Sequence, residues 1–140
     1  MAEQRVTLEP TSKQELDDIR RMIATNLSDA NVVGLSTQGR YEFAYNAARL
    51  VATIVIRASG YRVPSKAGHH FYTFQSLDAA NSAFTMTAAH FDAARRKRND
   101  FSYDTPASVS ETDAYELVSA VETFQLAVEK WIAVVNPTLS

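Results

Sequence analysis

The chain contains no cysteine and no long hydrophobic run, and these absences exclude several classes of protein. Without cysteine there is no disulfide framework, no thiolate metal site and no thiol nucleophile. No apolar run approaches the roughly 18 residues of a membrane span, and the first ten residues match neither a signal peptide nor a lipidation motif. We therefore expect a cytoplasmic protein that does not bind a membrane.

Glycine and proline are also scarce, with four of each among 140 residues. Long stretches free of both residues lie between them, which favours helices over strands. The length of the chain suits one domain. We expect a single domain over residues 1–140, with loose termini at residues 1–11 and 136–140.

Two long helices are expected in the N-terminal half. The pattern Ser12-Lys-Gln-Glu15 is a capping box, and apolar residues follow it at helical spacing as far as residues 31–34. A second helix is expected to open after Ser36 and to run to Ser59, where Gly60 stands in the position of a helix terminator. Its apolar residues cover so much of the helix circumference that we expect it at the centre of the fold.

The C-terminal half predicts further helices after a loop over residues 60–70. Residues 71–77 suggest a short helix or turn, and a longer helix is expected from about residue 78 to residue 98 or beyond. Two overlapping capping patterns, Ser108 to Glu111 and Ser110 to Asp113, open the last helix, which Pro137 ends. The predicted fold is all-α, an up-and-down antiparallel bundle of four to five helices.

The charge is unevenly distributed along the chain. The net charge is −2, yet residues 43–99 hold eight Arg and Lys residues against two acids. A local basic field attracts polyanions even when the whole chain is slightly acidic.

Within this basic segment, Phe84, Phe91 and Arg98 follow one another at intervals of seven and therefore share one helix face. An arginine at the end of an apolar stripe is expected to be partly buried and to need an acceptor. An external anion is one acceptor. An internal carboxylate such as Asp100, Asp104 or one on the last helix is another, and snorkelling to water or to carbonyls at a helix end is a third.

The neighbours of Arg98 are less specific signals. Arg95, Arg96 and Lys97 are cations near a helix C-terminus, where the helix dipole favours them in any case. Asn99 and Tyr103 are four apart, so their side chains would share a face if the helix continued.

The segments "YNAARLVATIVIRASGYRVPSKAGHHFYTFQSL" and "RRKRNDFSY" resemble the HEPN superfamily, the higher eukaryotes and prokaryotes nucleotide-binding domain, and in particular its small stand-alone bacterial members. The resemblance spans about Leu16 to Val135. It implies a helical bundle that is often a two-fold homodimer. Many active members are metal-independent ribonucleases of toxin–antitoxin or anti-phage systems, and others bind nucleotides or partner a small nucleotidyltransferase.

The family signature is an arginine, a polar residue and then a histidine, and the resemblance places these roles on Arg98, Asn99 and Tyr103. Tyrosine replaces the histidine here. With a pKa near 10, tyrosine loses on the order of 10³-fold in the population of its basic form at neutral pH. It can still donate to a phosphate oxygen or stack on a base. The motif therefore fits phosphate binding better than fast cleavage, with Arg95, Arg96 and Lys97 adding positive field.

The histidines are interpreted as structural. His69 and His70 follow Gly68 at the expected start of a helical turn, and His90 is expected at a helix surface or an interface. Adjacent histidines without cysteine or clustered acids make a poor metal signature, so neither a metal nor a cofactor is expected.

Two hypotheses of function follow. The first is a HEPN-like protein that binds RNA or a nucleotide, with metal-independent endoribonuclease activity left open. The second is a non-catalytic dimeric interaction module that partners a nucleotidyltransferase or an antitoxin and in which Arg98 braces the bundle.

Overall fold

The computed structural model describes residues 7–63, 73–77, 82–101 and 109–140, which are almost entirely helical. The long helices are α1 (Lys13–Ala30), α2 (Thr37–Ala58), α4 (Thr85–Phe101) and α5 (Glu111–Val135). Shorter helical pieces are a turn at residues 73–77 and the 3₁₀ helices η2 (Ser82–Phe84) and η3 (Pro137–Leu139). The predicted all-α helical bundle is confirmed.

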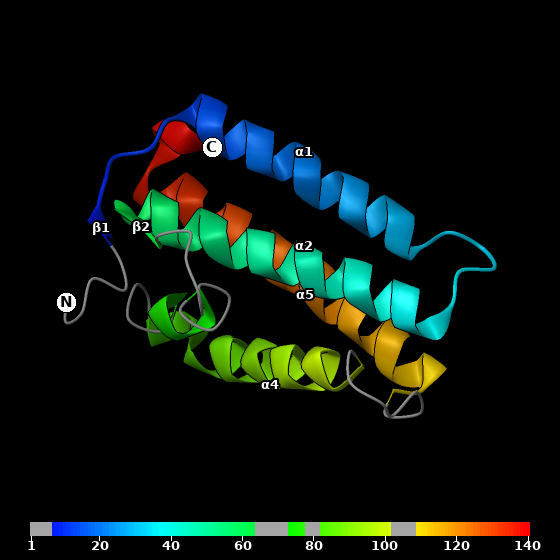
Figure 1. Cartoon of the computed structure of the whole chain (residues 1–140). Helices are drawn as coiled ribbons and strands as arrows, with labels where there is room; N and C mark the ends of the chain where they lie inside the picture. The colour runs from blue at the N-terminus through cyan, green and yellow to red at the C-terminus, as the bar shows by residue number, and fades with distance from the viewer. Residues whose placement is uncertain (1–6, 64–72, 78–81, 102–108) are drawn as a thin grey trace.

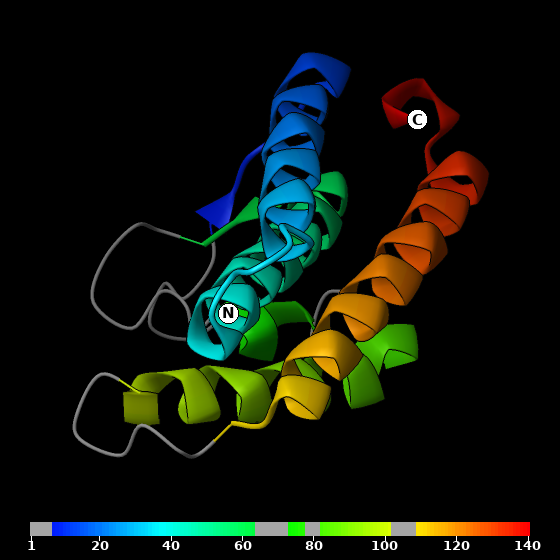
Figure 2. The ribbon, with the colours of Figure 1, turned by 90° about the vertical axis from the view of Figure 1, so that its right-hand side faces the viewer.

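Helix α2 lies at the centre of the bundle, as its broad apolar surface predicts. It contacts α1, α4 and α5, and consecutive long helices run in opposite directions (Figure 1). Helix α4 is inclined to the other three (Figure 2). Twelve of the 22 residues of α2 are buried, among them Tyr41 and Tyr45. None of the helices in the described ranges is long and apolar enough to cross a bilayer.

The predicted helix starts at Ser12, Ser36 and Ser110 are confirmed. The hydroxyls of Ser12 and Ser36 accept the backbone N–H of the residue three positions later, at 3.1 and 3.0 Å. Ser110 and Asp113 form a reciprocal capping box with distances of 3.0 and 3.1 Å. Ser108, the alternative cap, lies outside the described residues. At the end of α2, Gly60 has a φ of +93°, a conformation that glycine adopts without steric cost.

The predicted capping box at α1 needs a correction, because the Glu15 carboxylate has other partners. It accepts from the Thr11 hydroxyl at 2.5 Å and from Arg62 at 2.7 Å. These bonds attach the chain after α2 to the start of α1. A capping box would use the Glu15 carboxylate as acceptor for the backbone N–H of Ser12, and local sequence does not show that Thr11 and Arg62 occupy this acceptor instead.

Parts of the two end segments that were expected to be loose have regular structure. Strand β1 (Thr7–Leu8) pairs antiparallel with β2 (Tyr61–Arg62), in the segment expected to be loop. At the other end, Leu139 is buried in the core. Two-residue strands and a single apolar residue carry no periodic signal, which is why the sequence did not reveal them.

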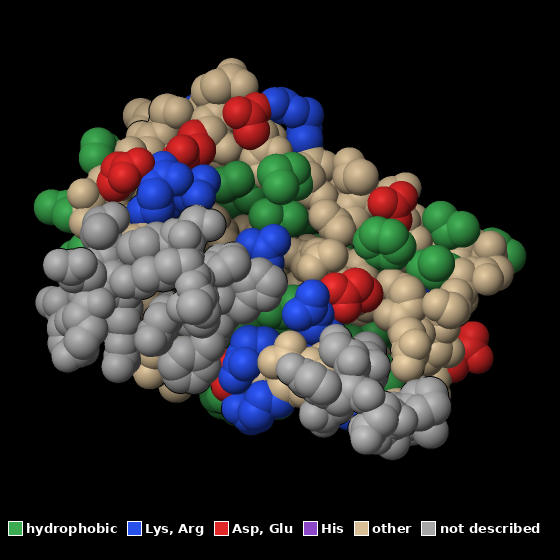
Figure 3. All heavy atoms as spheres, viewed as in Figure 1, with side chains coloured by type: hydrophobic (Ala, Val, Ile, Leu, Met, Phe, Trp, Pro, Cys, Tyr) green, Lys and Arg blue, Asp and Glu red, His purple; other side chains and the backbone are tan. Residues whose placement is uncertain are grey.

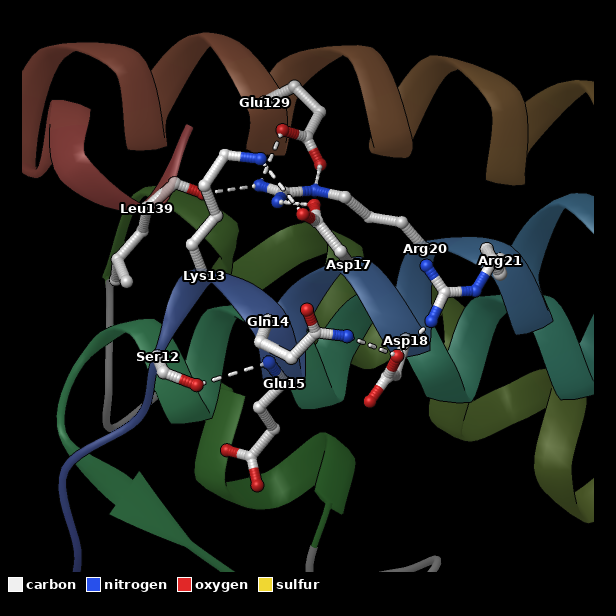
Figure 4. Close-up of polar contacts among 10 residues, drawn as sticks. All are labelled: Ser12, Lys13, Gln14, Glu15, Asp17, Asp18, Arg20, Arg21, Glu129 and Leu139. Carbon is white, nitrogen blue, oxygen red and sulfur yellow. Dashed lines mark hydrogen bonds and ion pairs between the residues drawn. The ribbon is translucent and has the colours of Figure 1, made fainter.

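Arg20 holds the C-terminal turn against α1. Its Nε and Nη2 atoms donate to Glu129 on α5 at 2.9 and 3.0 Å, and Nη1 donates to Asp17 at 2.8 Å. Nη2 also donates to the backbone carbonyl of Leu139 at 2.8 Å (Figure 4). Burial opposes the charge of Arg20, but the hydrogen bonds that it donates to Glu129 and Asp17 outweigh this effect and raise the pKa of the guanidinium. The charge of Arg20 is fully compensated within the fold.

The fourth helix begins later than expected. The prediction started it near residue 78, whereas a 3₁₀ turn occupies Ser82–Phe84 and α4 begins at Thr85. The predicted apolar stripe is confirmed, since Phe84 and Phe91 are buried, and Phe91 stacks near Phe124 of α5 with ring centroids 5.3 Å apart. The stripe leads along α4 toward Arg98.

Candidate functional site

Arg98 is partly buried, as predicted, and its acceptor is Glu42 on α2. The side chain is 28% exposed, and its Nε donates to the two carboxylate oxygens of Glu42 at 3.1 and 3.0 Å. Its Nη2 donates to Glu42 Oε1 at 2.9 Å. The guanidinium carbon lies 5.3 Å from the ring centroid of Tyr45, within cation–π range. The hydrogen bonds to Glu42 raise the pKa of Arg98.

This ion pair corrects the expected partners of Arg98. The carboxylates considered from sequence were Asp100, Asp104 and one on the last helix, whereas Glu42 belongs to α2. Asp104 and the side chain of Asp100 lie outside the described residues. A carboxylate 56 positions earlier in the chain gives no local signal, because only the packing of α4 on α2 brings it near.

The rest of the cationic run is also paired inside the fold. Arg95 and Arg96 share Asp92, at 2.8 and 2.6 Å, and Lys97 reaches Asp113 at 3.3 Å. The four consecutive cations therefore meet three carboxylates. The run is not a free basic patch, and the excess of positive charge that it leaves is small.

Of the other two residues of the predicted motif, the structure describes only one. Asn99 is half-buried, and its Oδ1 is 3.5 Å from Arg98 Nη1, a long contact. Tyr103 lies outside the described residues, as do His69 and His70. The predicted hydrogen bond between Asn99 and Tyr103 stays a prediction, and so do the structural roles of the two histidines.

Tyr45 does not supply a base beside Arg98. Its side chain is fully buried, and burial raises the pKa of Tyr45 to about 12, although the positive charge of Arg98 acts in the opposite direction. The hydroxyl is therefore protonated at neutral pH. His90, the histidine in the described ranges, is exposed on α4 and packs against Phe91 with ring centroids 5.2 Å apart, as expected for a surface position.

Arg49 is a second cation near Arg98 that the sequence analysis did not single out. It is half-buried on α2, and its Nε is hidden from solvent without a hydrogen-bond partner. Burial lowers the pKa of Arg49, and the like charge of Arg98 adds to this effect. No carboxylate in the described part of the chain pairs with it. A desolvated guanidinium without a counter-charge is costly, which makes this position attractive to an anion.

A sequence signal for Arg49 existed. Glu42, Tyr45 and Arg49 are spaced three and four apart, so they lie on one face of the second helix. In the structure Arg98 contacts Glu42 and Tyr45, and the charges of Arg49 and Arg98 act on each other. Lys and Arg side chains gather over α2 and α4 with acidic side chains beside them (Figure 3).

The arrangement can bind an anion but offers no metal centre. No group of three or more His, Asp or Glu side chains within the described ranges could hold a metal ion. Comparisons with protein-family models, curated proteins and solved structures give no match for this chain. The case for function therefore depends on the residues themselves.

Proposed function

We propose that this protein is HEPN-like and binds RNA or a nucleotide through phosphate groups on the surface formed by Arg49 and Arg98. One observation carries the proposal: Arg49 is a partly buried cation without a carboxylate partner among the described residues, next to a second guanidinium. The resemblance of the cationic motif to the HEPN signature supports the same assignment. A homodimer remains an expectation from that resemblance.

Glu42 is compatible with phosphate binding at Arg98, because it occupies only one edge of the guanidinium. It holds Nε and Nη2, whereas Nη1 makes only the long contact to Asn99 among the bonds within the described residues. Arginine can present two N–H groups to phosphate oxygens in a fork. Glu42 would then orient the side chain, and a phosphate would approach from the Nη1 side.

Catalysis has less support than binding. Metal-independent RNA cleavage needs a base for the 2′-hydroxyl and an acid for the leaving oxygen. Tyr45, with a pKa of about 12, is a poor base at neutral pH. We therefore propose binding as the primary activity and treat cleavage as a separate outcome of the same experiment.

The test measures the affinity for a labelled RNA panel in the presence of a chelator at two or more salt concentrations. Arg98→Gln and Arg49→Gln are each expected to weaken binding about tenfold and to reduce the slope of log affinity against log salt by about one. Lys130→Gln, an exposed position on α5, is the control for net charge. Unchanged affinity in both arginine variants would contradict the proposal. Cleavage by wild type but not by Arg98→Gln would add endoribonuclease activity, and equal cleavage by both would exclude it.

A second function is favoured by the Arg98–Glu42 ion pair itself. The pair joins α2 to α4, which is the bracing role expected of a non-catalytic dimeric module that partners a nucleotidyltransferase or an antitoxin. In that case Arg98→Gln would lower the melting temperature and leave RNA affinity unchanged. The same variant thus separates the two functions.

A further inference from the structure

A pocket of about 250 Å³ lies between α1 and α2 and has Arg49 in its lining. Its walls are mostly apolar and carry two arginines, both from α2. The lining residues are Ile19, Met22, Arg49, Leu50, Thr53, Ile56, Arg57, Val63 and Thr73. A concave and largely apolar pocket with a few polar groups is typical of small-molecule sites.

Arg57 resembles Arg49 in being poorly compensated. Its Nε is hidden from solvent without a hydrogen-bond partner among the described residues, and its Nη1 forms only a long ion pair with Glu15, at 3.7 Å. That carboxylate is bonded more closely to Arg62 and Thr11. Burial lowers the pKa of Arg57 and the nearby charge of Arg62 adds to this effect, whereas the carboxylates of Glu15 and Glu9 oppose it.

The two arginines lie on the same side of α2 and are separated by two helical turns. Eight residues correspond to about 12 Å along the helix axis. Thr53 lies between them, and its hydroxyl donates to the backbone carbonyl of Arg49 at 2.9 Å, so its methyl group is left for the wall of the pocket. A molecule with two separated anionic groups matches this spacing better than one small oxyanion does.

The fold itself can saturate an arginine, as Arg20 shows with four hydrogen bonds to Glu129, Asp17 and Leu139. Among the described residues, Arg49 has no carboxylate partner and Arg57 has only the long ion pair with Glu15, so an anion in the pocket would supply counter-charge that the described part of the fold does not. An apolar wall between them restricts the ligand further, because it stabilises a hydrocarbon spacer and not a chain of charges.

We propose that this pocket binds a small organic dianion, with one oxyanion on Arg49, the other on Arg57, and an apolar spacer against Met22, Ile19 and Leu50. The pocket shares Arg49 with the surface proposed for RNA, whereas Arg57 and Met22 belong to the pocket alone, so the test below reads these two residues. Carboxylate and phosphate heads share the chemistry that an arginine recognises, so both are tested.

The experiment uses the full chain with ¹³C-labelled methionine methyl groups and follows their NMR signals during titration. Met22 lines the pocket, whereas Met86 lines a separate groove between α4 and α5 and serves as an internal control. Met22→Leu assigns the signal. The probes are suberate, octanoate and 1,8-octanediol, which have similar chains with two, one and no anionic groups, together with 1,6-hexanediol bisphosphate.

The expected result is a saturable shift of the Met22 signal with either dianion and no shift of Met86. Suberate should bind about tenfold more tightly than octanoate, and the diol more weakly than both. Stronger binding of the bisphosphate would identify phosphate heads, and stronger binding of suberate would identify carboxylates. A Met22 signal unmoved by both dianions, or equally moved by the diol, would overturn the proposal.

Variants test the role of each arginine. Arg57→Gln should make suberate and octanoate equal in affinity, and Lys130→Gln should preserve their difference. Arg57→Gln should leave RNA affinity unchanged, and Arg98→Gln should leave the Met22 titration unchanged, so failure of the pocket and failure of RNA binding are distinguishable. If Arg57→Gln does not fold, the titrations of the wild-type protein with the four probes still test the proposal.

Discussion

Arginines on the two sides of α1 differ in how closely they are paired with carboxylates. On the side that faces α5, Arg20 is bonded to two carboxylates and a backbone carbonyl, and its pKa is raised (Figure 4). On the side that faces α2, Arg49 and Arg57 line a pocket with hidden Nε atoms, and their pKa values are lowered. An arginine whose N–H groups are bonded to carboxylates stabilises the fold. A desolvated arginine without close carboxylate partners reduces the stability of the fold.

Removal of Arg20 should produce the largest loss of stability. Arg20→Gln breaks the links of α1 to α5 and to the C-terminal turn and leaves Glu129 without its cation, which is expected to cost on the order of 2–3 kcal/mol. Urea denaturation measures the effect. Arg21→Gln is the matched control, because Arg21 is exposed and pairs only with Asp18 among the described residues; it should cost less than about 0.5 kcal/mol. Equal losses of stability in Arg20→Gln and Arg21→Gln would show that the bonds of Arg20 contribute no more than the exposed pair of Arg21.

Removal of Arg49 should act in the opposite direction. Arg49→Met keeps the apolar stem but removes a desolvated charge, so the free energy of unfolding should stay unchanged or rise by about 1 kcal/mol. The same denaturation series measures it beside Arg20→Gln. A loss of stability similar to that of Arg20→Gln would show that Arg49 is a structural residue after all.

The Arg98–Glu42 pair should make an intermediate contribution to the free energy of unfolding, because it is partly exposed. A double-mutant cycle with Arg98→Gln and Glu42→Gln is expected to give a coupling energy of about 0.5–1 kcal/mol. A coupling near zero would remove the bracing role and weaken the interaction-module hypothesis. A coupling well above this range would favour it.

The smallest expected effect is a dependence of stability on pH through Glu15. The hydrogen bond from Thr11, and then that from Arg62, holds the pKa of Glu15 below its ordinary value of 4.5. The unfolded chain therefore binds the proton more readily, so this contribution is present above about pH 4.5 and is lost as the pH falls through the lower folded-state pKa. Urea midpoints at several pH values should fall less steeply below pH ~4.5 for Glu15→Gln than for wild type, and parallel curves would rule out the linkage.

Several features of the fold could be read from local sequence. The serine caps at Ser12, Ser36 and Ser110 and the terminating Gly60 act within a few residues, so short patterns reveal them. The apolar stripe of α4 follows from helical periodicity, and so does the partial burial of Arg98. These interactions depend on neighbours along one helix, whatever packs against it.

Only the tertiary structure decided how the charges are matched. The choice of Glu42 for Arg98, the bonding of Arg20 to α5 and the weak pairing of Arg49 and Arg57 among the described residues depend on which helix faces meet. Helix α4 is inclined to its neighbours (Figure 2), and its packing on α2 places Arg98 beside Glu42. The amino-acid sequence by itself determined the helices and the number of charges, and packing decided which charges have partners, because electrostatic compensation depends on distance in space.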